Sequence, residues 1–215
     1  MNIKIVYDNE AKAPLRSDWG FSALIEGEET ILFDTGEDGD ILKSNFEKMD
    51  IDASSIDKVA LSHEHHDHIG GLFSIIEPSM KIFVPDAFSE RFKTKVKKRA
   101  TLIEVVEKKE ISNEIISFTE TGAEVIEQSI LCRTDDGNVL VTGCAHPGLT
   151  PIIEKAADHG EIKGVVGGFH GFDDFTALED IPLLVPCHCT EYKDKIKSMY
   201  SDKVIDCFAG LEIEV

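Results

Sequence analysis

The chain has 215 residues, of which 42% are hydrophobic, and a formal net charge of −19. This length suits one sizeable core, and so acidic a surface argues against nucleic-acid backbones and anionic membranes as partners. No apolar run approaches the ~20 residues that span a bilayer, and the N-terminus does not resemble a secretory signal. The odd number of cysteines, five, makes a poor disulfide framework. We therefore expect one domain over residues 1–215, a cytoplasmic location and reduced thiols.

Strand and helix patterns alternate along the whole chain. Short apolar and β-branched runs predict strands at 2–7, 20–26, 30–33, 59–61, 81–84, within 101–143, at 162–166, up to 185, and at 204–208 and 211–215. Helical spacing and end signals predict helices at 38–48, 86–96, 150–160, 174–179 and 190–200. Thr150 is expected to cap the third of these helices, with Pro151 in its first position. This order suits two stacked sheets with helices on their outer faces.

The densest chemical signal is the segment 61–71, LSHEHHDHIGG, which directly follows a short apolar strand. Its four imidazoles belong to His63, His65, His66 and His68, and the carboxylate of Asp67 lies among them. Imidazole and carboxylate groups are the usual protein ligands of zinc, iron and manganese. Without a cation, so many polar groups at one strand end would lack hydrogen-bond partners. The sequence therefore predicts one or two divalent transition-metal ions, with zinc as the first choice. By alternation, His66 is expected to point away from this site.

The segment HEHHDH matches the HxHxDH motif of the metallo-β-lactamase superfamily, which the chain resembles in three further places. These are ILFDTG at 31–36, VLVTGCAHPG at 139–148 and PCHCT at 186–190. The resemblance implies an α/β fold, the αββα four-layer sandwich of two mixed β-sheets with helices outside. It also implies a one- or two-metal site at the edge of the sandwich, where a metal-bound hydroxide is the usual nucleophile.

Within the superfamily, the chain is most similar to the dihydropterin (ribofuranosyl)aminobenzene phosphate synthase-like branch. The similarity rests on GFSALIE at 20–26, TGCAHPG at 142–148, GGFH at 167–170 and the PCHCT segment. Proteins of that branch are generally longer, so segments that cover their substrate are expected to be missing from this chain.

The family pattern implies a set of metal ligands, with two departures. Many members have a metal-bridging aspartate after the TG dipeptide, where this chain has Cys144, and residues 118–131 lack the usual additional histidine. We infer that His146 fills the ligand position that would otherwise be empty. The resulting assignment gives one ion to His63, His65 and His146, and a second ion to Asp67, His68 and His188.

Further residues are expected around the ions. Asp34, in the DTG segment, is expected to orient a ligand imidazole, with a turn-capping aspartate as the alternative. His170 is interpreted as an acid–base group or substrate contact, with a structural histidine as the alternative. Cys144 stays open between a ligand and a packing residue, whereas Cys187 and Cys189 are expected to pack as small apolar residues.

Trp19 precedes the strand at 20–26, where it could stack on a planar substrate, although a partly buried structural tryptophan is expected. The basic run at 93–99 is interpreted as a solvated helix end.

Together these residues indicate a binuclear, metal-dependent hydrolase with His170 and Asp67 as catalytic groups. The expected substrate is a phosphorylated or ester small molecule, in the manner of the dihydropterin phosphate synthase-like branch. A metal-binding sensor or binding module with little turnover is the alternative, because the bridging aspartate is missing. A di-iron redox enzyme is disfavoured because the chain has no room for a flavin domain.

Overall fold

The computed structural model describes residues 1–215, and its strands form two mixed sheets. The strands of the first sheet are β1 (Asn2–Tyr7), β2 (Ser22–Glu26), β3 (Thr30–Phe33), β4 (Lys58–Ala60), β5 (Lys81–Pro85), β6 (Thr101–Val105) and β13 (Glu212–Glu214). They lie in the order β13-β1-β2-β3-β4-β5-β6. Pairing is antiparallel from β13 to β3 and parallel from β3 to β6, so the carboxyl ends of β3 and β4 reach the same edge.

The second sheet has the order β12-β11-β10-β9-β8-β7. Its strands are β7 (Lys108–Glu110), β8 (Ile115–Thr121), β9 (Ile126–Thr134), β10 (Gly137–Thr142), β11 (Ile162–Gly168) and β12 (Leu183–Cys187). The strands β10, β11 and β12 are parallel, and their carboxyl ends share one edge. A turn after residue 134 joins β9 to β10 as an antiparallel hairpin.

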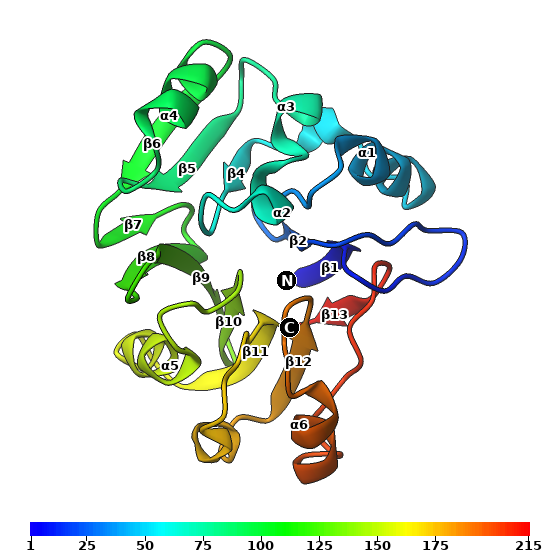
Figure 1. Cartoon of the computed structure of the whole chain (residues 1–215), viewed down its shortest axis with the longest axis vertical. Coiled ribbons are helices and arrows are strands. Elements are labelled where there is room, and N and C mark those ends of the chain that lie inside the picture. Colours follow the sequence, from blue (N-terminus) through cyan, green and yellow to red (C-terminus); the bar gives the residue numbers. More distant parts are fainter.

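The helices are α1 (Gly39–Lys48), α2 (His66–Ile69), α3 (Leu72–Ile75), α4 (Glu90–Lys97), α5 (Leu149–Ala157) and α6 (Lys193–Met199), with short 3₁₀ turns η1 (Ala53–Ser55) and η2 (Phe175–Leu178). Figure 1 shows α1, α3 and α4 along one side of the molecule and α5 and α6 along the other, with the sheets between them. None of the helices has both the length and the apolar character that crossing a membrane requires.

Three apolar clusters separate the layers. Between the sheets, Ile5 and Phe33 of the first sheet share a cluster with Val141 and Val166 of the second. A second cluster joins the other face of the first sheet to α1, α3 and α4, and a third joins the second sheet to α5, η2 and α6. Helices, sheet, sheet and helices therefore follow one another, and the predicted αββα sandwich is confirmed.

Two predicted helix starts are wrong because polar side chains act differently from expectation. The helix α4 begins at Glu90 and not at 86, because the Ser89 hydroxyl caps it by accepting the Phe92 N–H at 3.2 Å. The helix α5 begins at Leu149, and Gly148, with φ of 100°, takes the capping position. Thr150 lies inside the first turn, where its hydroxyl bonds Asp174 at 3.1 Å.

The region between β12 and β13 also differs from the prediction. The helix α6 starts at Lys193, because the Thr190 hydroxyl donates to the Cys187 carbonyl at 2.7 Å and holds a turn there. The predicted strand at 204–208 reduces to one isolated bridge from Val204 to Leu184. Beyond it the chain leaves the sheet, since Asp206 is held by Lys197 on α6.

Candidate metal centre

The carboxyl ends of strands from both sheets meet at one edge of the sandwich and carry the polar residues of the site. Those segments contribute Asp34 after β3, His63 after β4, Cys144 after β10, His170 after β11 and His188 after β12. Four residues here have positive φ values of 59°, 58°, 45° and 42°: Asp34, Ala145, His170 and His188. Non-glycine residues rarely adopt this conformation, and such strain concentrates at functional sites.

Six predicted ligands lie in two groups of three. The first trio consists of His63, His65 and His146, whose ligand atoms all lie within 4.8 Å of one another. The second trio consists of Asp67, His68 and His188, and its ligand atoms also lie within 4.8 Å of one another. The trios adjoin, because the ring of His63 lies 4.3 Å from the ring of His68 between centroids. The structure thus brings all six side chains together in the two predicted groups.

The hydrogen bonds of the imidazoles fix which ring nitrogen faces the centre. His68 Nδ1 lies 2.6 Å from Asp34, and His146 Nδ1 lies 2.9 Å from Glu127. His188 Nδ1 lies 2.9 Å from the side-chain oxygen of Asn9. Because each of these oxygens accepts, each Nδ1 carries the proton, and each Nε2 presents a lone pair towards the centre.

His63 follows the same rule through a hydroxyl. The Ser62 hydroxyl donates to Asp34 at 2.7 Å, so it accepts from His63 Nδ1 at 2.8 Å. The free Nε2 of His63 then faces Nδ1 of His65 at 3.0 Å. Lone pairs of neutral imidazoles and the Asp67 carboxylate therefore converge, a donor set that fits a divalent cation.

Burial keeps the deepest imidazoles neutral. Burial lowers the pKa of His63 to about 3. Burial, together with the neighbouring imidazole of His188, lowers the pKa of His68 to about 3 as well. Burial by itself raises the pKa of Asp67, but the adjacent imidazoles of His188 and His68 hold that pKa well below its ordinary value. Neutral imidazoles beside an ionised carboxylate are the protonation states in which these residues bind metals.

Asp34 orients the second trio, as its place in the sequence predicted. Its two oxygens accept the backbone N–H of Ser62 at 2.7 Å and the bond from His68, and no part of Asp34 is exposed. Burial raises the pKa of Asp34 to about 8, although the bonds from Ser62 oppose that shift. A cation on the far side of His68 would favour the ionised form of this carboxyl group.

Glu127 on β9 plays the matching part for the first trio, and sequence reasoning missed it. Its carboxylate accepts the backbone N–H groups of Cys144, Ala145 and His146 at 2.7, 2.9 and 3.0 Å. Burial raises the pKa of Glu127, but the bond from the His146 ring, the His63 charge and these N–H groups together lower it to about 2. The signal was an acid near the start of a run of strand-like composition that ends in apolar residues, IEQSILC at 126–132, which the structure buries almost completely.

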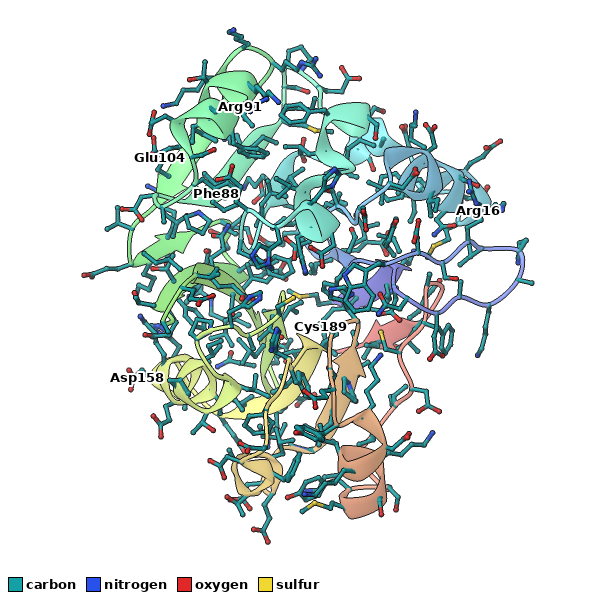
Figure 2. All side chains as sticks on the ribbon, in the orientation of Figure 1. Arg16, Phe88, Arg91, Glu104, Asp158 and Cys189 are labelled. Atoms are coloured by element: carbon teal, nitrogen blue, oxygen red, sulfur yellow. The ribbon has the colours of Figure 1, made fainter.

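The cysteines divide differently from expectation. Cys187 is buried and its thiol donates to the Val185 carbonyl at 3.1 Å, as a packing residue. Cys189 is only partly buried, and its sulfur lies within 4.8 Å of the Cys144 sulfur and a ring nitrogen of His188, so simple core packing is wrong for it. The sulfur of Cys144 lies 3.1 Å from Nε2 of His68, a position from which it can serve as a ligand. Figure 2 places Cys189 at the middle of the molecule, where the two halves meet.

Three aromatic side chains lie around the six donors. His170 is exposed, and its ring centroid lies 4.9 Å from that of His146. Trp19 is 53% exposed and its ring lies 4.7 Å from that of His188, so the expected partly buried structural tryptophan is wrong. His66 is exposed and belongs to neither trio, as alternation predicted.

A cavity of about 340 Å³ opens beside the first trio. His146 and His170 line it together with Leu149, Phe169, Phe172 and Asp174. Its size and mixed apolar and polar walls suit part of a small organic molecule.

The fold and the donor set define an αββα sandwich protein with a candidate metal centre at the edge of its sheets. A family model described as the metallo-beta-lactamase superfamily matches residues 20–82. An uncharacterized protein of Methanocaldococcus jannaschii is 30% identical over 235 residues, which cover 89% of this chain and 91% of that protein. The chain therefore belongs to the metallo-β-lactamase superfamily, whose members are usually metal-dependent hydrolases.

Two further relatives are similar over most of their length. The 7,8-dihydropterin-6-methyl-4-(β-D-ribofuranosyl)-aminobenzene-5′-phosphate synthase of Methanocaldococcus jannaschii is 28% identical over 268 residues, 90% of this chain and 91% of that enzyme. The crystal structure of Tm1679, a metal-dependent hydrolase of the β-lactamase superfamily, superposes with a TM-score of 0.85 at 29% identity. The match covers 100% of this chain and 99% of Tm1679.

Proposed function

We propose that this protein is a metal-dependent hydrolase that acts on a phosphorylated or ester small molecule. One observation carries the proposal: two adjoining donor trios, each backed by a fully buried carboxylate, converge on one open edge. Two divalent cations held there, zinc in the first instance, would polarise a phosphoryl or carbonyl group and lower the pKa of nearby water. The dihydropterin phosphate synthase among the relatives supports a phosphorylated substrate with a planar ring.

The protein's own residues supply binding, orientation and proton transfer. Asp34 and Glu127 fix the imidazoles of His68 and His146 in one orientation, so the donors need little rearrangement on binding. Asp67 is the one carboxylate among the six donors, and it is partly open to solvent, where it can orient the attacking water. His170, exposed beside His146, is placed to protonate the leaving group or to steer the substrate.

The test begins with metal content. Protein purified without chelator should contain one or two ions of zinc, iron or manganese per chain by elemental analysis, and should hydrolyse at least one member of a panel of phosphodiesters and lactones. The variant H65A should lose metal and activity, whereas H159A, which changes a histidine after α5 that belongs to neither trio, should keep both. Protein without metal, and without uptake on reconstitution, would refute the proposal.

The second candidate is a metal-binding sensor or binding module, and Cys144 favours it. A cysteine stands where many superfamily members have a bridging aspartate, and a thiolate binds zinc tightly. This function would be indicated by full metal occupancy and ligand binding without turnover on any member of the panel.

A further inference from the structure

A groove of about 450 Å³ runs between α4 on one side and α2 and α3 on the other. Its apolar walls are the side chains of Ile69, Phe73 and Phe92, and its charged residues are Arg91, Lys95 and Glu64, with His66 beside them. Figure 2 places Arg91 on α4 at the top of the molecule, near α3. We call this feature the α3–α4 groove.

The cationic residues of α4 divide between two faces of the helix. On one face, Lys93 is 5% exposed and pairs with Glu90 at 2.6 Å and Glu104 at 2.9 Å, and Lys97 also pairs with Glu104. The sequence analysis interpreted the run 93–99 as a solvated helix end. For Lys93 that interpretation is wrong, because its side chain is buried and paired. Arg91 and Lys95 lie on the face towards the groove, four residues apart, and neither forms an ion pair.

Two positive charges four residues apart on a helix repel each other unless an acid lies between them. Here no acid does, although the protein has many more acidic than basic residues. The chain has 41 acidic and 22 basic residues, so acidic partners are abundant. Arg99, two residues after the end of α4, lies with its guanidinium 5.2 Å from the Phe73 ring centroid. Lys95 lies 5.9 Å from the same centroid. Arg91, Lys95 and Arg99 thus place positive charge along an apolar wall, and none of the three forms an ion pair with an acid.

The groove has two cations, Arg91 and Lys95, but only one acid, Glu64, which bonds to Ser89 and pairs with neither cation. One of its oxygens accepts the Ser89 N–H and the other accepts the Ser89 hydroxyl. In contrast, a cavity of about 530 Å³ elsewhere on the surface sets Arg133 against Glu114, Asp135 and Asp136. The α3–α4 groove is therefore electrostatically suited to an anion, although the protein as a whole repels anions.

The groove and the first trio share one segment of the chain, the residues that follow β4. Glu64 and His66 line the groove, and His65 between them belongs to the first trio. A ligand that reaches both would cross this segment, so the length of its connecting portion decides whether it can bind both.

We propose that the α3–α4 groove binds a carboxylate or phosphate group of the substrate, remote from the bond that is broken at the metal centre. Arg91 and Lys95 contact the anion, and Phe73 contacts the apolar portion that connects it to the reacting group. The inference rests on the proposed function, since it assigns a substrate class to the same centre: molecules with an anionic end. Arginine suits this role because its planar fork binds carboxylate and phosphate oxygens in pairs.

The test uses phosphonates as probes, because a phosphonate can occupy the metal centre without being hydrolysed. Affinities of metal-loaded protein are measured by calorimetry for phosphonoalkanoates, from phosphonoacetate to 6-phosphonohexanoate, and for alkylphosphonates of equal length. At the best length, the carboxylate should strengthen binding about tenfold to a hundredfold. In the double variant R91Q/K95Q this gain should disappear. The matched variant K97Q/K98Q, which removes two charges at the end of the same helix, should retain it.

A gain from the carboxylate at no length, or a gain that survives in R91Q/K95Q, would overturn the inference. Failure of the metal centre has a different signature, because plain alkylphosphonates would then not bind. In that event, modification of arginine by phenylglyoxal tests separately whether the groove binds an anion. Pyrophosphate should protect Arg91 from modification and leave Arg133 reactive, as judged by peptide mass spectrometry. Equal reactivity of both arginines with and without pyrophosphate would refute the groove.

Discussion

The two trios of the metal centre differ in charge and in burial. The first trio contains imidazoles alone, and its member His65 is exposed. The second trio includes the Asp67 carboxylate, and the side chains of His68 and His188 are fully buried. An anionic donor beside two fully buried imidazoles holds a divalent cation more strongly than neutral donors near water. We therefore expect the second trio to retain its ion during stepwise chelation, and the first to admit water and substrate.

The carboxylates behind the trios differ in the same way. Glu127 receives three backbone N–H groups and is stabilised as an anion by the protein itself. Asp34 receives one backbone N–H and a hydroxyl, and burial shifts its pKa upwards. The charge of Asp34 consequently depends more on a cation nearby. The first trio is thus organised before metal binds, whereas the second is completed by it.

The largest effect should come from removing one donor of each trio, in H65A and D67A. Each variant should lose about one ion per chain, because three donors are reduced to two. Turnover should fall about 10³-fold or more, since a metal ion contributes several kcal/mol of charge stabilisation. Elemental analysis and kinetics on the same sample measure both quantities. D67A could keep both ions while H65A loses one. The second trio would then bind its ion more strongly than the first even without a carboxylate, and the charge of Asp67 would not be the reason for that difference.

The variant H170A tests whether the first trio has its own proton donor. We expect kcat to fall about 10²- to 10⁴-fold, the usual contribution of a positioned acid or base. Metal content should remain unchanged, because the imidazole of His170 belongs to neither trio. Loss of metal together with activity would make His170 a ligand, and unchanged turnover would make it structural.

The variants E127Q and D34N compare the two backing carboxylates directly. Each replaces a hydrogen-bonded carboxylate by an amide of the same shape, and each should weaken metal affinity about 10- to 100-fold. E127Q should weaken binding of the ion held by the first trio, and D34N should weaken binding of the ion held by the second trio. Competition with a chromophoric chelator resolves the two ions. Equal weakening of both ions in either variant would show that the trios act as one unit.

The smallest effect should come from W19A on the side of the second trio. The Trp19 ring contacts His188 from the solvent side, so its loss should raise KM about two- to tenfold for planar substrates, the range of an aromatic contact. W19F should restore most of the affinity. A change in metal content in W19A would instead assign the ring to the support of His188.

The sequence predicted the layers of the fold from local patterns, because apolar runs define strands. The grouping of the six donors came from the family resemblance, with His146 placed in the ligand position that would otherwise be empty. Glu127 escaped prediction because its role depends on the docking of β9 under the segment after β10, a contact that no local pattern records. Cys189 and Trp19 escaped for the same reason. Their exposure is set by the meeting of the two sheets and not by their neighbours in the chain.

The apolar layer between the sheets also acts as a spacer for the centre. His63 and His65 stand on the edge of the first sheet and His146 on the edge of the second, so the separation of the sheets sets the distance between donors. Packed sheets lie about 10 Å apart, and shrinking one side chain in that layer changes this gap only partly, because the surroundings relax incompletely. A substitution such as I130A, in the cluster between the sheets, can therefore lower the metal affinity of the first trio. The side chains of this interior thus serve the metal centre through the spacing of the sheets as well as through the stability of the fold.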